Sequence, residues 1–132
     1  MMQENANMVA TRKGYDAFAK GDLEGIRNFL EPDVIWHQVG HDAISGDYRG
    51  IDAVLGMMAK EFELSGGDIT VELVDVYSTD TRTVAVEHLV AHRNGKTLDK
   101  TFPIVFNGQG GKAREVWAYP FGDDDALADF WS

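Results

Sequence analysis

The sequence predicts an α+β domain in which helices pack on one face of a strongly curved antiparallel sheet, leaving a cone-shaped space between the two layers. Two observations support this prediction. Apolar residues recur at helical spacing through most of the first 64 positions, and from residue 68 the period changes to two, as in strands. Turn signals at Asn94-Gly95 and at 108–111 separate the later runs at hairpin spacing. Helices followed by a meander of strands favour segregated layers.

The helices are expected from their apolar stripes and their end signals. A first helix is expected over residues 5–20; Gly21 ends it and Asp22 caps a second, which Pro32 stops. A third helix is expected over 51–64, ahead of a Gly-Gly pair. Gly14 lies inside the first helix, where glycine costs about 1 kcal/mol against alanine and marks a close approach by another group.

The strands are expected from alternating β-branched and aromatic residues. A turn-rich loop over 40–50 follows the first of them, and a short terminal helix follows the acidic run 123–125, whose charges suit a helix N-terminus. The expected strands cover residues 34–39, 69–77, 83–93, 98–106 and 113–121.

Size and composition restrict the class of protein. The 132 residues fit one domain, 1–132, and the chain has no cysteine, which excludes thiolate chemistry. The net charge of −10 opposes binding to nucleic acid or to an anionic membrane. The first residues lack the pattern of a secretory signal, and no apolar run has the length of a membrane helix, so we expect a cytoplasmic protein.

The first strand places chemistry-bearing residues on opposite faces. Trp36 and Gln38 share the face that we assign to the cavity, since an indole ring suits a pocket wall, although a plain core role stays open for Trp36. His37 points to the other face, toward a possible subunit contact. His41 lies beyond the strand, at the cavity rim.

Three residues are candidates for proton transfer and a larger set for the cavity wall. The candidate catalytic residues are His41, His37 and Asp123, with helix capping as the alternative role of Asp123. Core packing is the alternative role of His88 and of the aromatic stripe on the last strand. The expected cavity residues are Tyr15, Phe18, Trp36, Gln38, Tyr48, Leu55, Met58, Phe62, His88, Trp117 and Tyr119.

A metal site is not expected. The histidine pairs His37/His41 and His88/His92 are each four residues apart, which on a strand spans about 13 Å, too wide for one ion with bonds of about 2.1 Å. The sequence also has no phosphate loop, no nucleophile elbow and no dinucleotide fingerprint. We therefore expect no cofactor.

Several segments in order resemble the NTF2-like superfamily, most closely its SnoaL-like, ketosteroid-isomerase-related domains. The stretch from Gly21 to His37, which reads GDLEGIRNFLEPDVIWH, resembles the opening of that family. Gly46-Asp47-Tyr48-Arg49-Gly50 resembles the family's entry to its third helix, and the segments 111–117 and 123–131 resemble its last strand and acidic tail. The resemblance covers nearly the whole chain and implies the cone-shaped fold.

The resemblance also implies small-molecule chemistry, with departures at individual positions. Where the isomerases carry a tyrosine on the first helix this chain has Gly14, with Tyr15 one place away. The position of the isomerases' aspartate base corresponds to Gln38 when residues are counted forward from Ile26. It corresponds to His37 when they are counted back from Gly40. The cyclase acid is matched only near Asp123. A dehydratase-like site would draw on Tyr15, His41 and His88.

The sequence leaves more than one function open. The first is a cofactor-free acid–base isomerase, cyclase or dehydratase that acts on a small apolar cyclic compound. The alternative is a ligand-binding or accessory domain without catalysis, and a third is a protein–protein adaptor. Relatives of this kind expose an apolar convex sheet face, which implies a homodimer through that face.

Overall fold

The computed structural model describes residues 4–120 and 124–132, and within them the chain forms four helices and one six-stranded sheet. The helices are α1 (Ala6–Lys20), α2 (Leu23–Phe29), α3 (Ile51–Leu64) and α4 (Asp124–Phe130). The strands are β1 (Leu30–Gln38), β2 (Gly46–Arg49), β3 (Ile69–Ser78), β4 (Arg82–Arg93), β5 (Lys96–Gln109) and β6 (Lys112–Ala118).

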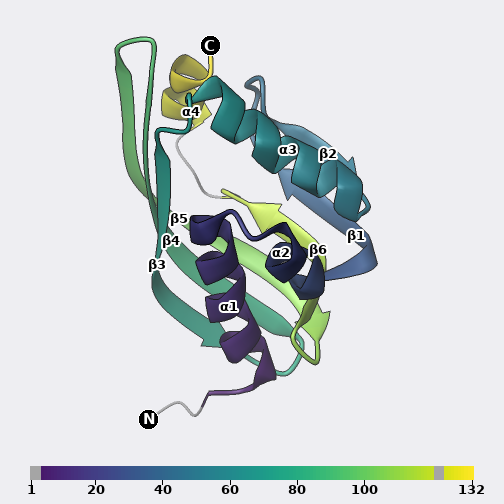
Figure 1. Ribbon diagram of the computed structural model, residues 1–132. Helices are drawn as coiled ribbons and strands as arrows, with labels where there is room; N and C mark the ends of the chain where they lie inside the picture. Colours follow the sequence, from purple (N-terminus) through teal and green to yellow (C-terminus); the bar gives the residue numbers. More distant parts are fainter. Residues whose placement is uncertain (1–3, 121–123) are drawn as a thin grey trace.

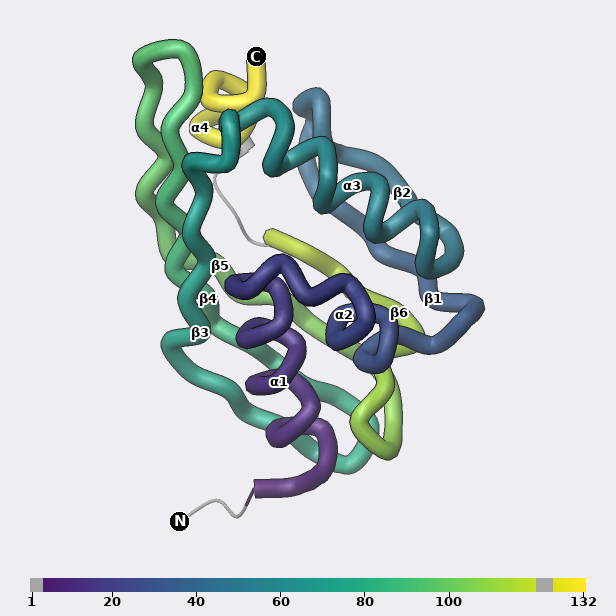
Figure 2. Tube along the Cα trace, viewed as in Figure 1, coloured from purple at the N-terminus to yellow at the C-terminus, as the bar shows by residue number. Residues whose placement is uncertain are grey.

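The helices lie on one face of the sheet, which has the strand order β2-β1-β6-β5-β4-β3 (Figure 1). Helix α1 contacts β3, β4 and β5, α2 contacts β1 and β6, and α3 contacts β1 and β2. The Cα trace in Figure 2 shows α1 and α2 as one antiparallel pair and α3 as a separate diagonal element. The predicted α+β class, with helices gathered on one sheet face, is confirmed.

The first two helices begin and end as their cap residues require. The Asn5 side chain accepts a hydrogen bond from the Met8 amide at 3.0 Å, and the Asp22 side chain accepts one from the Gly25 amide at 3.1 Å. Gly21 ends α1 in the left-handed region, at φ 68°. The close approach expected at Gly14 is made by Phe29, since a Cβ at Gly14 would lie 3.3 Å from the Phe29 ring.

The sheet differs from the prediction in one pairing. Strands β1 and β6 run parallel, with Trp36 opposite Val116 and His37 opposite Trp117, so the sheet is mixed and not wholly antiparallel. The remaining neighbours are antiparallel. The prediction of a meander assumed that each strand pairs with the next one along the chain. In the structure the last strand, β6, lies between β1 and β5.

Two element boundaries also differ. Helix α2 ends at Phe29 and β1 begins at Leu30, so Pro32 lies in the strand, beside an irregularity in the β1–β6 register between Leu30 and Ile35. The segment expected as one loop, 40–50, contains the edge strand β2, which pairs with β1. Its sequence, GDYR, lacks the alternation of a half-buried strand because its residues are half-buried or exposed.

Bulges bend the strands around the helices. The β4–β5 hairpin turns at Asn94 and Gly95, both with positive φ (51° and 77°), as the Asn-Gly signal predicts. The β5–β6 register shifts between Asn107 and Gly108, and there the two backbones come very close. A Cβ on Gly108 would lie 1.9 Å from the Lys112 carbonyl oxygen, so glycine is required at this bulge.

The core lies between the helices and the inner face of the sheet. Many of its fully buried side chains come from β1, α3, β4, β6 and α4, so the short helix α4 is anchored to the rest of the domain. They include Leu30, Val34, Val54, Leu89, Val116, Leu127 and Phe130. Within the described residues, none of the helices combines the length and the apolar character that a membrane span requires.

Substitution of Gly108 by alanine should destabilise the fold by about 2 kcal/mol, because the added methyl group must displace the Lys112 backbone. The matched control is Gly56→Ala on α3, where a Cβ meets nothing within 4 Å and the loss of unfolded-state entropy should stabilise the protein by about 0.5–1 kcal/mol. Urea unfolding of both variants measures the difference. Equal stability of the two would contradict the close β5–β6 approach.

Candidate active site

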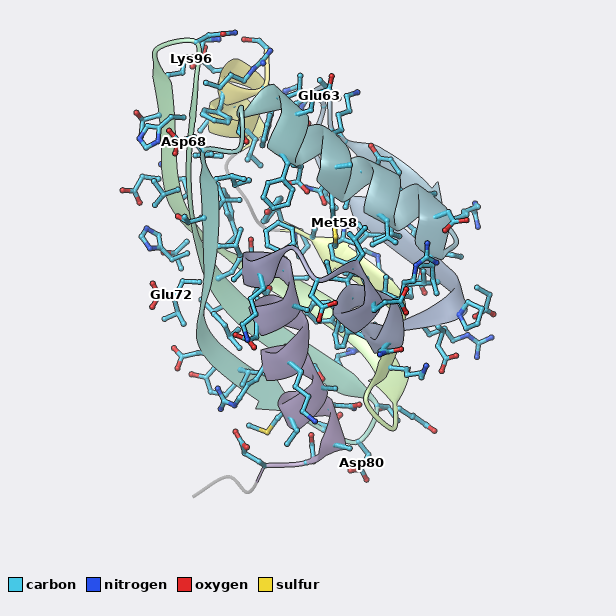
Figure 3. All side chains as sticks on the ribbon, viewed as in Figure 1. Met58, Glu63, Asp68, Glu72, Asp80 and Lys96 are labelled. Carbon is cyan, nitrogen blue, oxygen red and sulfur yellow. The ribbon has the colours of Figure 1, made fainter. Side chains whose placement is uncertain are left out.

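A cavity of ≈ 70 Å³ lies between the helices and the inner face of the sheet. This volume is well below that of pockets for drug-sized ligands, which measure about 300–1,000 Å³, so any ligand enclosed here must be small. Figure 3 shows Met58 of α3 between that helix and the α1–α2 pair. The cavity is lined by Thr11, Gly14, Tyr15, Phe18, Ile26, Phe29, Leu30, Trp36, Gln38, Met58, Glu61, Val71, Glu87, Ile104, Phe106 and Tyr119.

The wall of the cavity is largely aromatic. The Phe106 ring packs nearly perpendicular to two neighbouring rings. Its centroid lies 5.3 Å from that of Phe29 and 6.2 Å from that of Trp36. The indole N–H of Trp36 donates to the Gln38 side-chain oxygen at 2.9 Å. Because that hydrogen bond satisfies the one polar atom of the indole ring, Trp36 can form part of an apolar surface.

One carboxyl group lies in the middle of this surface. Glu87 of β4 is 3% exposed and accepts hydrogen bonds from the Tyr15 hydroxyl at 2.6 Å and the Tyr119 hydroxyl at 3.0 Å. Burial raises the pKa of Glu87 to about 7, although both tyrosine hydrogen bonds oppose the rise by stabilising the carboxylate. A carboxyl group with this pKa can both accept and release a proton near neutral pH.

The two tyrosines reach Glu87 from opposite layers. Tyr15 comes from α1, and Tyr119 follows the last residue of β6 with φ 61°, a left-handed conformation that a tyrosine rarely adopts. Packing of Tyr119 on the Phe102 ring, 4.4 Å between centroids, helps to hold it there. Burial first, and then Glu87, raise the pKa of both phenols well above 10, so both remain hydrogen-bond donors.

A second buried carboxyl group faces the same cavity. Glu61 of α3 is 7% exposed, and within residues 4–120 and 124–132 no hydrogen bond reaches its carboxyl group. Burial first, and then the carboxyl groups of Glu87 and Asp42, raise the pKa of Glu61 to about 8. The site therefore carries an acidic pair, of which the member held by the two tyrosines is the first to ionise.

Comparison with known proteins places this geometry in a family. A family model described as the SnoaL-like domain matches residues 11–130. The chain belongs to the SnoaL-like family. A relative in Mycobacterium tuberculosis, the uncharacterized protein Rv0034, is 33% identical over 132 residues, which cover 99% of this chain and 100% of the relative.

Solved structures agree with the SnoaL-like assignment. Bal32a, from a soil-derived mobile gene cassette, superposes with a TM-score of 0.90 at 29% identity, over 96% of this chain and 97% of its own. An NTF2-like protein of unknown function from Burkholderia pseudomallei gives a TM-score of 0.83 at 20% identity, over 98% and 99% of the two chains. These likenesses confirm the predicted cone-shaped, NTF2-like fold.

The SnoaL-like cavity brings together six of the eleven residues expected to line it. These are Tyr15, Phe18, Trp36, Gln38, Met58 and Tyr119. Three others lie close to the cavity without lining it. Leu55 is buried in the core, Phe62 packs on Phe18 at 5.1 Å between centroids, and Tyr48 donates its hydroxyl hydrogen bond to the Ile44 carbonyl.

The last two expected cavity residues, His88 and Trp117, lie on the outer face of the sheet, so their assignment to the cavity is wrong. His88 bonds to Asp99 at 2.6 Å, and Trp117 stacks on His37 at 5.5 Å. On β4 the set with Ala85, Glu87 and Leu89 faces inward and is buried, whereas Val84, Val86 and His88 lie on the other face.

The candidate bases chosen from sequence do not meet in the cavity. His37 lies on the outer face, as expected, between Asp47 and Glu115 at 2.7 Å each, and these carboxylates raise its pKa. Both ring nitrogens are thus bonded to acceptors, which fits a structural imidazolium linking β2, β1 and β6. His41 is exposed in the loop after β1. Asp123 lies outside the described residues.

Glu61 and Glu87 were missed by sequence reasoning, and only one of them left a signal. Glu87 alternates with Ala85, Leu89 and Ala91, a pattern of small and apolar residues in which a lone carboxylate marks either a charged outer face or a buried site. Glu61 falls in a charged stretch of α3, between Lys60 and Glu63, that reads as solvent-exposed. Among the described residues no cluster of three or more metal-binding side chains occurs.

The free energy of unfolding should fall as the pH rises from about 5 to 8. The folded state raises the pKa of Glu61 above its unfolded value, so its protonated form favours folding and that contribution is lost as pH rises through about 8. Glu61→Gln should remove much of this dependence and exceed the wild type in stability at pH 8, by on the order of 3 kcal/mol.

The matched control is Glu63→Gln, an exposed position on the same helix (Figure 3). Its stability profile should follow that of the wild type at every pH. Urea unfolding between pH 5 and 9 measures all three proteins. A Glu61→Gln profile that stays parallel to the wild-type profile would show that Glu61 ionises normally in the folded state.

Proposed function

We propose that the protein is a cofactor-free acid–base catalyst that acts on a small, largely apolar cyclic compound bound in the cavity. The observation that carries this proposal is the Glu87 carboxyl group, buried in an aromatic cavity and hydrogen-bonded to Tyr15 and Tyr119. A domain that only bound an apolar ligand would have no need to bury this ionisable group, whose desolvation opposes folding.

Proton transfer in this site follows from the two environments of its carboxyl groups. Ionised Glu87 takes a proton from a carbon of the bound ring next to a carbonyl group, and the electron pair moves onto the carbonyl oxygen as an enolate. Glu61, with the higher pKa, is protonated at pH 7 and can donate to that oxygen. Where a carbon–carbon double bond adjoins the deprotonated carbon, the enolate extends over it, and return of the proton from Glu87 to the far end of that double bond completes an isomerisation while Glu61 regains its own proton.

The tyrosines keep Glu87 in position for this step. Their hydroxyl groups bond to different oxygens of the carboxyl group, Tyr15 to Oε1 and Tyr119 to Oε2, and so fix the plane of the base. Each retains lone pairs on its hydroxyl oxygen. Water competes poorly for the base because the surrounding side chains are aromatic.

Exchange of the α-protons of cyclopentanone in deuterated water tests this proposal without knowledge of the natural substrate. The wild type should accelerate the exchange, followed by proton NMR, with a rate that rises with pH through about 7 as Glu87 ionises. Glu87→Gln should lower the catalysed rate about 10²–10⁴-fold, since the amide accepts no proton.

The control for this experiment is Glu72→Gln on β3, an exposed position away from the helices (Figure 3). It should exchange cyclopentanone at the wild-type rate. Equal rates for Glu87→Gln and the wild type would refute the catalytic role and favour the alternative of a non-catalytic ligand-binding domain. Native mass spectrometry of a co-purified compound would then identify what the cavity holds.

We also propose that the protein forms a homodimer through the outer face of the sheet. That face carries a groove of ≈ 1030 Å³ whose lining includes three acidic and three basic side chains beside apolar ones, on a chain whose net charge is −10. In a two-fold interface the same surface of each copy faces its equivalent on the other copy. A patch with equal numbers of acidic and basic side chains therefore avoids the repulsion between acidic surfaces that a net charge of −10 would otherwise cause. The charged residues are Glu31, Asp33, Glu115, Arg82, Lys112 and Arg114.

Light scattering coupled to size-exclusion chromatography should give twice the chain mass at micromolar concentration. Val84→Arg, at an apolar position in the lining of the groove, should shift the protein to the monomer, because it inserts an unpaired charge into the interface. Leu23→Arg on α2, an exposed apolar position away from the groove, should leave the dimer intact. A monomeric wild type would refute the proposal.

A further inference from the structure

The cavity is acidic and contains no basic side chain. Of the residues that line it, Glu61 and Glu87 are ionisable at neutral pH, and none is lysine, arginine or histidine. The walls are aromatic rings and aliphatic side chains, which provide no counter-charge. A bound anion would therefore meet two carboxyl groups in a medium of low dielectric constant, where repulsion is strong.

Most polar atoms around the cavity already have partners. Glu87 accepts from both tyrosines, the Trp36 indole N–H donates to Gln38, and the Thr11 hydroxyl donates to the Asn7 carbonyl at 2.7 Å. Glu61 is the exception among the described lining residues that carry a carboxyl group.

The unpartnered Glu61 carboxyl group implies a donor on the ligand. The side chain is more than nine-tenths buried, it lines the cavity, and its oxygens keep access to the cavity space without a hydrogen bond among the described residues, so a ligand in the cavity can reach them. A neutral donor would supply one hydrogen bond. A cationic donor would in addition allow Glu61 and Glu87 to ionise together, because it neutralises the repulsion between them.

The aromatic wall favours the cation as well. The faces of aromatic rings attract ammonium groups, most strongly for tryptophan, and such contacts strengthen when water is excluded. Trp36, Phe18, Phe29 and Phe106 all line this space. The volume of ≈ 70 Å³ limits the ligand to a single small ring or its equivalent.

We propose that the cavity is selective for a small cyclic amine, bound as the ammonium ion, whose N–H groups donate to the carboxylates of Glu61 and Glu87. This inference rests on the proposed function only for the location of the site. It concerns a ligand that competes with the carbonyl substrate, because the ammonium ion keeps both carboxyl groups ionised and leaves no protonated Glu61 for proton transfer. The apolar ring packs against the aromatic wall. The ammonium group supplies the hydrogen-bond donor that Glu61 lacks.

Binding of the ammonium ion is linked to proton release. Burial raises the pKa of both carboxyl groups, to about 8 for Glu61 and about 7 for Glu87, and the cation favours their ionised forms. Affinity for the amine should therefore increase with pH between 6.5 and 8.5, a range in which an alkylamine keeps its own proton. A neutral ligand of the same shape gains nothing from this linkage.

Three probes of the same shape test the inference: cyclopentylamine, cyclopentanol and cyclopentanecarboxylate. Calorimetric titration at pH 8.5 should show the amine binding at least about tenfold more tightly than the alcohol, with the carboxylate not binding. Between pH 6.5 and 8.5 the amine affinity should rise about tenfold or more, and the alcohol affinity should stay constant. Circular dichroism at each pH checks that the fold is retained.

Substitutions locate the effect at Glu61. Glu61→Gln should reduce the amine affinity about tenfold or more and leave the alcohol affinity unchanged, whereas Glu63→Gln, exposed on the same helix, should match the wild type with all three probes. Glu87→Gln provides a second variant and should also weaken amine binding. Loss of pH dependence in either variant would support the linkage.

The outcomes separate this inference from the function on which it rests. If the alcohol binds as tightly as the amine, or more tightly, selectivity for a cation is refuted while the cavity remains a ligand site. If neither amine nor alcohol binds, the inference is refuted, and the exchange of cyclopentanone protons still decides the proposed function separately. Tight binding of the carboxylate would overturn the inference alone.

Discussion

The site depends on one costly arrangement, a carboxyl group buried between two phenols. Glu87 can stay within the domain because Tyr15 and Tyr119 donate to its two oxygens, which offsets part of the free energy lost when the group leaves water. These partners come from α1, β4 and the end of β6, so the hydrogen bonds also fix the helix layer against the sheet. The strained backbone of Tyr119 is a further cost of the same arrangement.

Around that carboxyl group the fold keeps an opening in an otherwise close-packed core. Gly14 on α1 lines the opening, and a side chain at that position would reach toward the Phe29 ring beside it. The aromatic rings at the wall pack edge to face on one another and retain their positions. A second carboxyl group, Glu61, faces the opening from α3, so opposite layers supply the two members of the acidic pair.

Much of the fold follows from the sequence because it rests on local rules. Helical spacing, the caps Asp22 and Gly21, and the Asn94-Gly95 turn predicted most elements within a few residues. The inner face of β1 could also be assigned, because the indole ring of Trp36 favours burial over exposure. The parallel β1–β6 pair could not, since strand order depends on contacts between residues about 80 positions apart.

The chemistry of the site was harder to predict because it depends on which face of β4 turns inward. Alternation defined two sets of residues, and the set with Val84, Val86 and His88 has the bulk that usually marks a core. The structure buries the other set, and Glu87 with it. Glu61 was not predicted as a site residue because glutamates are usually exposed to solvent. Histidines drew attention as bases, yet His37 and His88 bond to carboxylates on the outer face.

The position of β6 between β1 and β5 has a consequence for how the chain reaches this structure. Until residues 112–118 have emerged from the ribosome, the strand pair β1–β2 has no neighbour to join it to the β3–β4–β5 meander. The contacts between β1 and β6 therefore form only after most of the chain has been made. Pairing residues about 80 positions apart requires closure of a long loop before the contact forms, which slows folding relative to a domain held by local contacts alone.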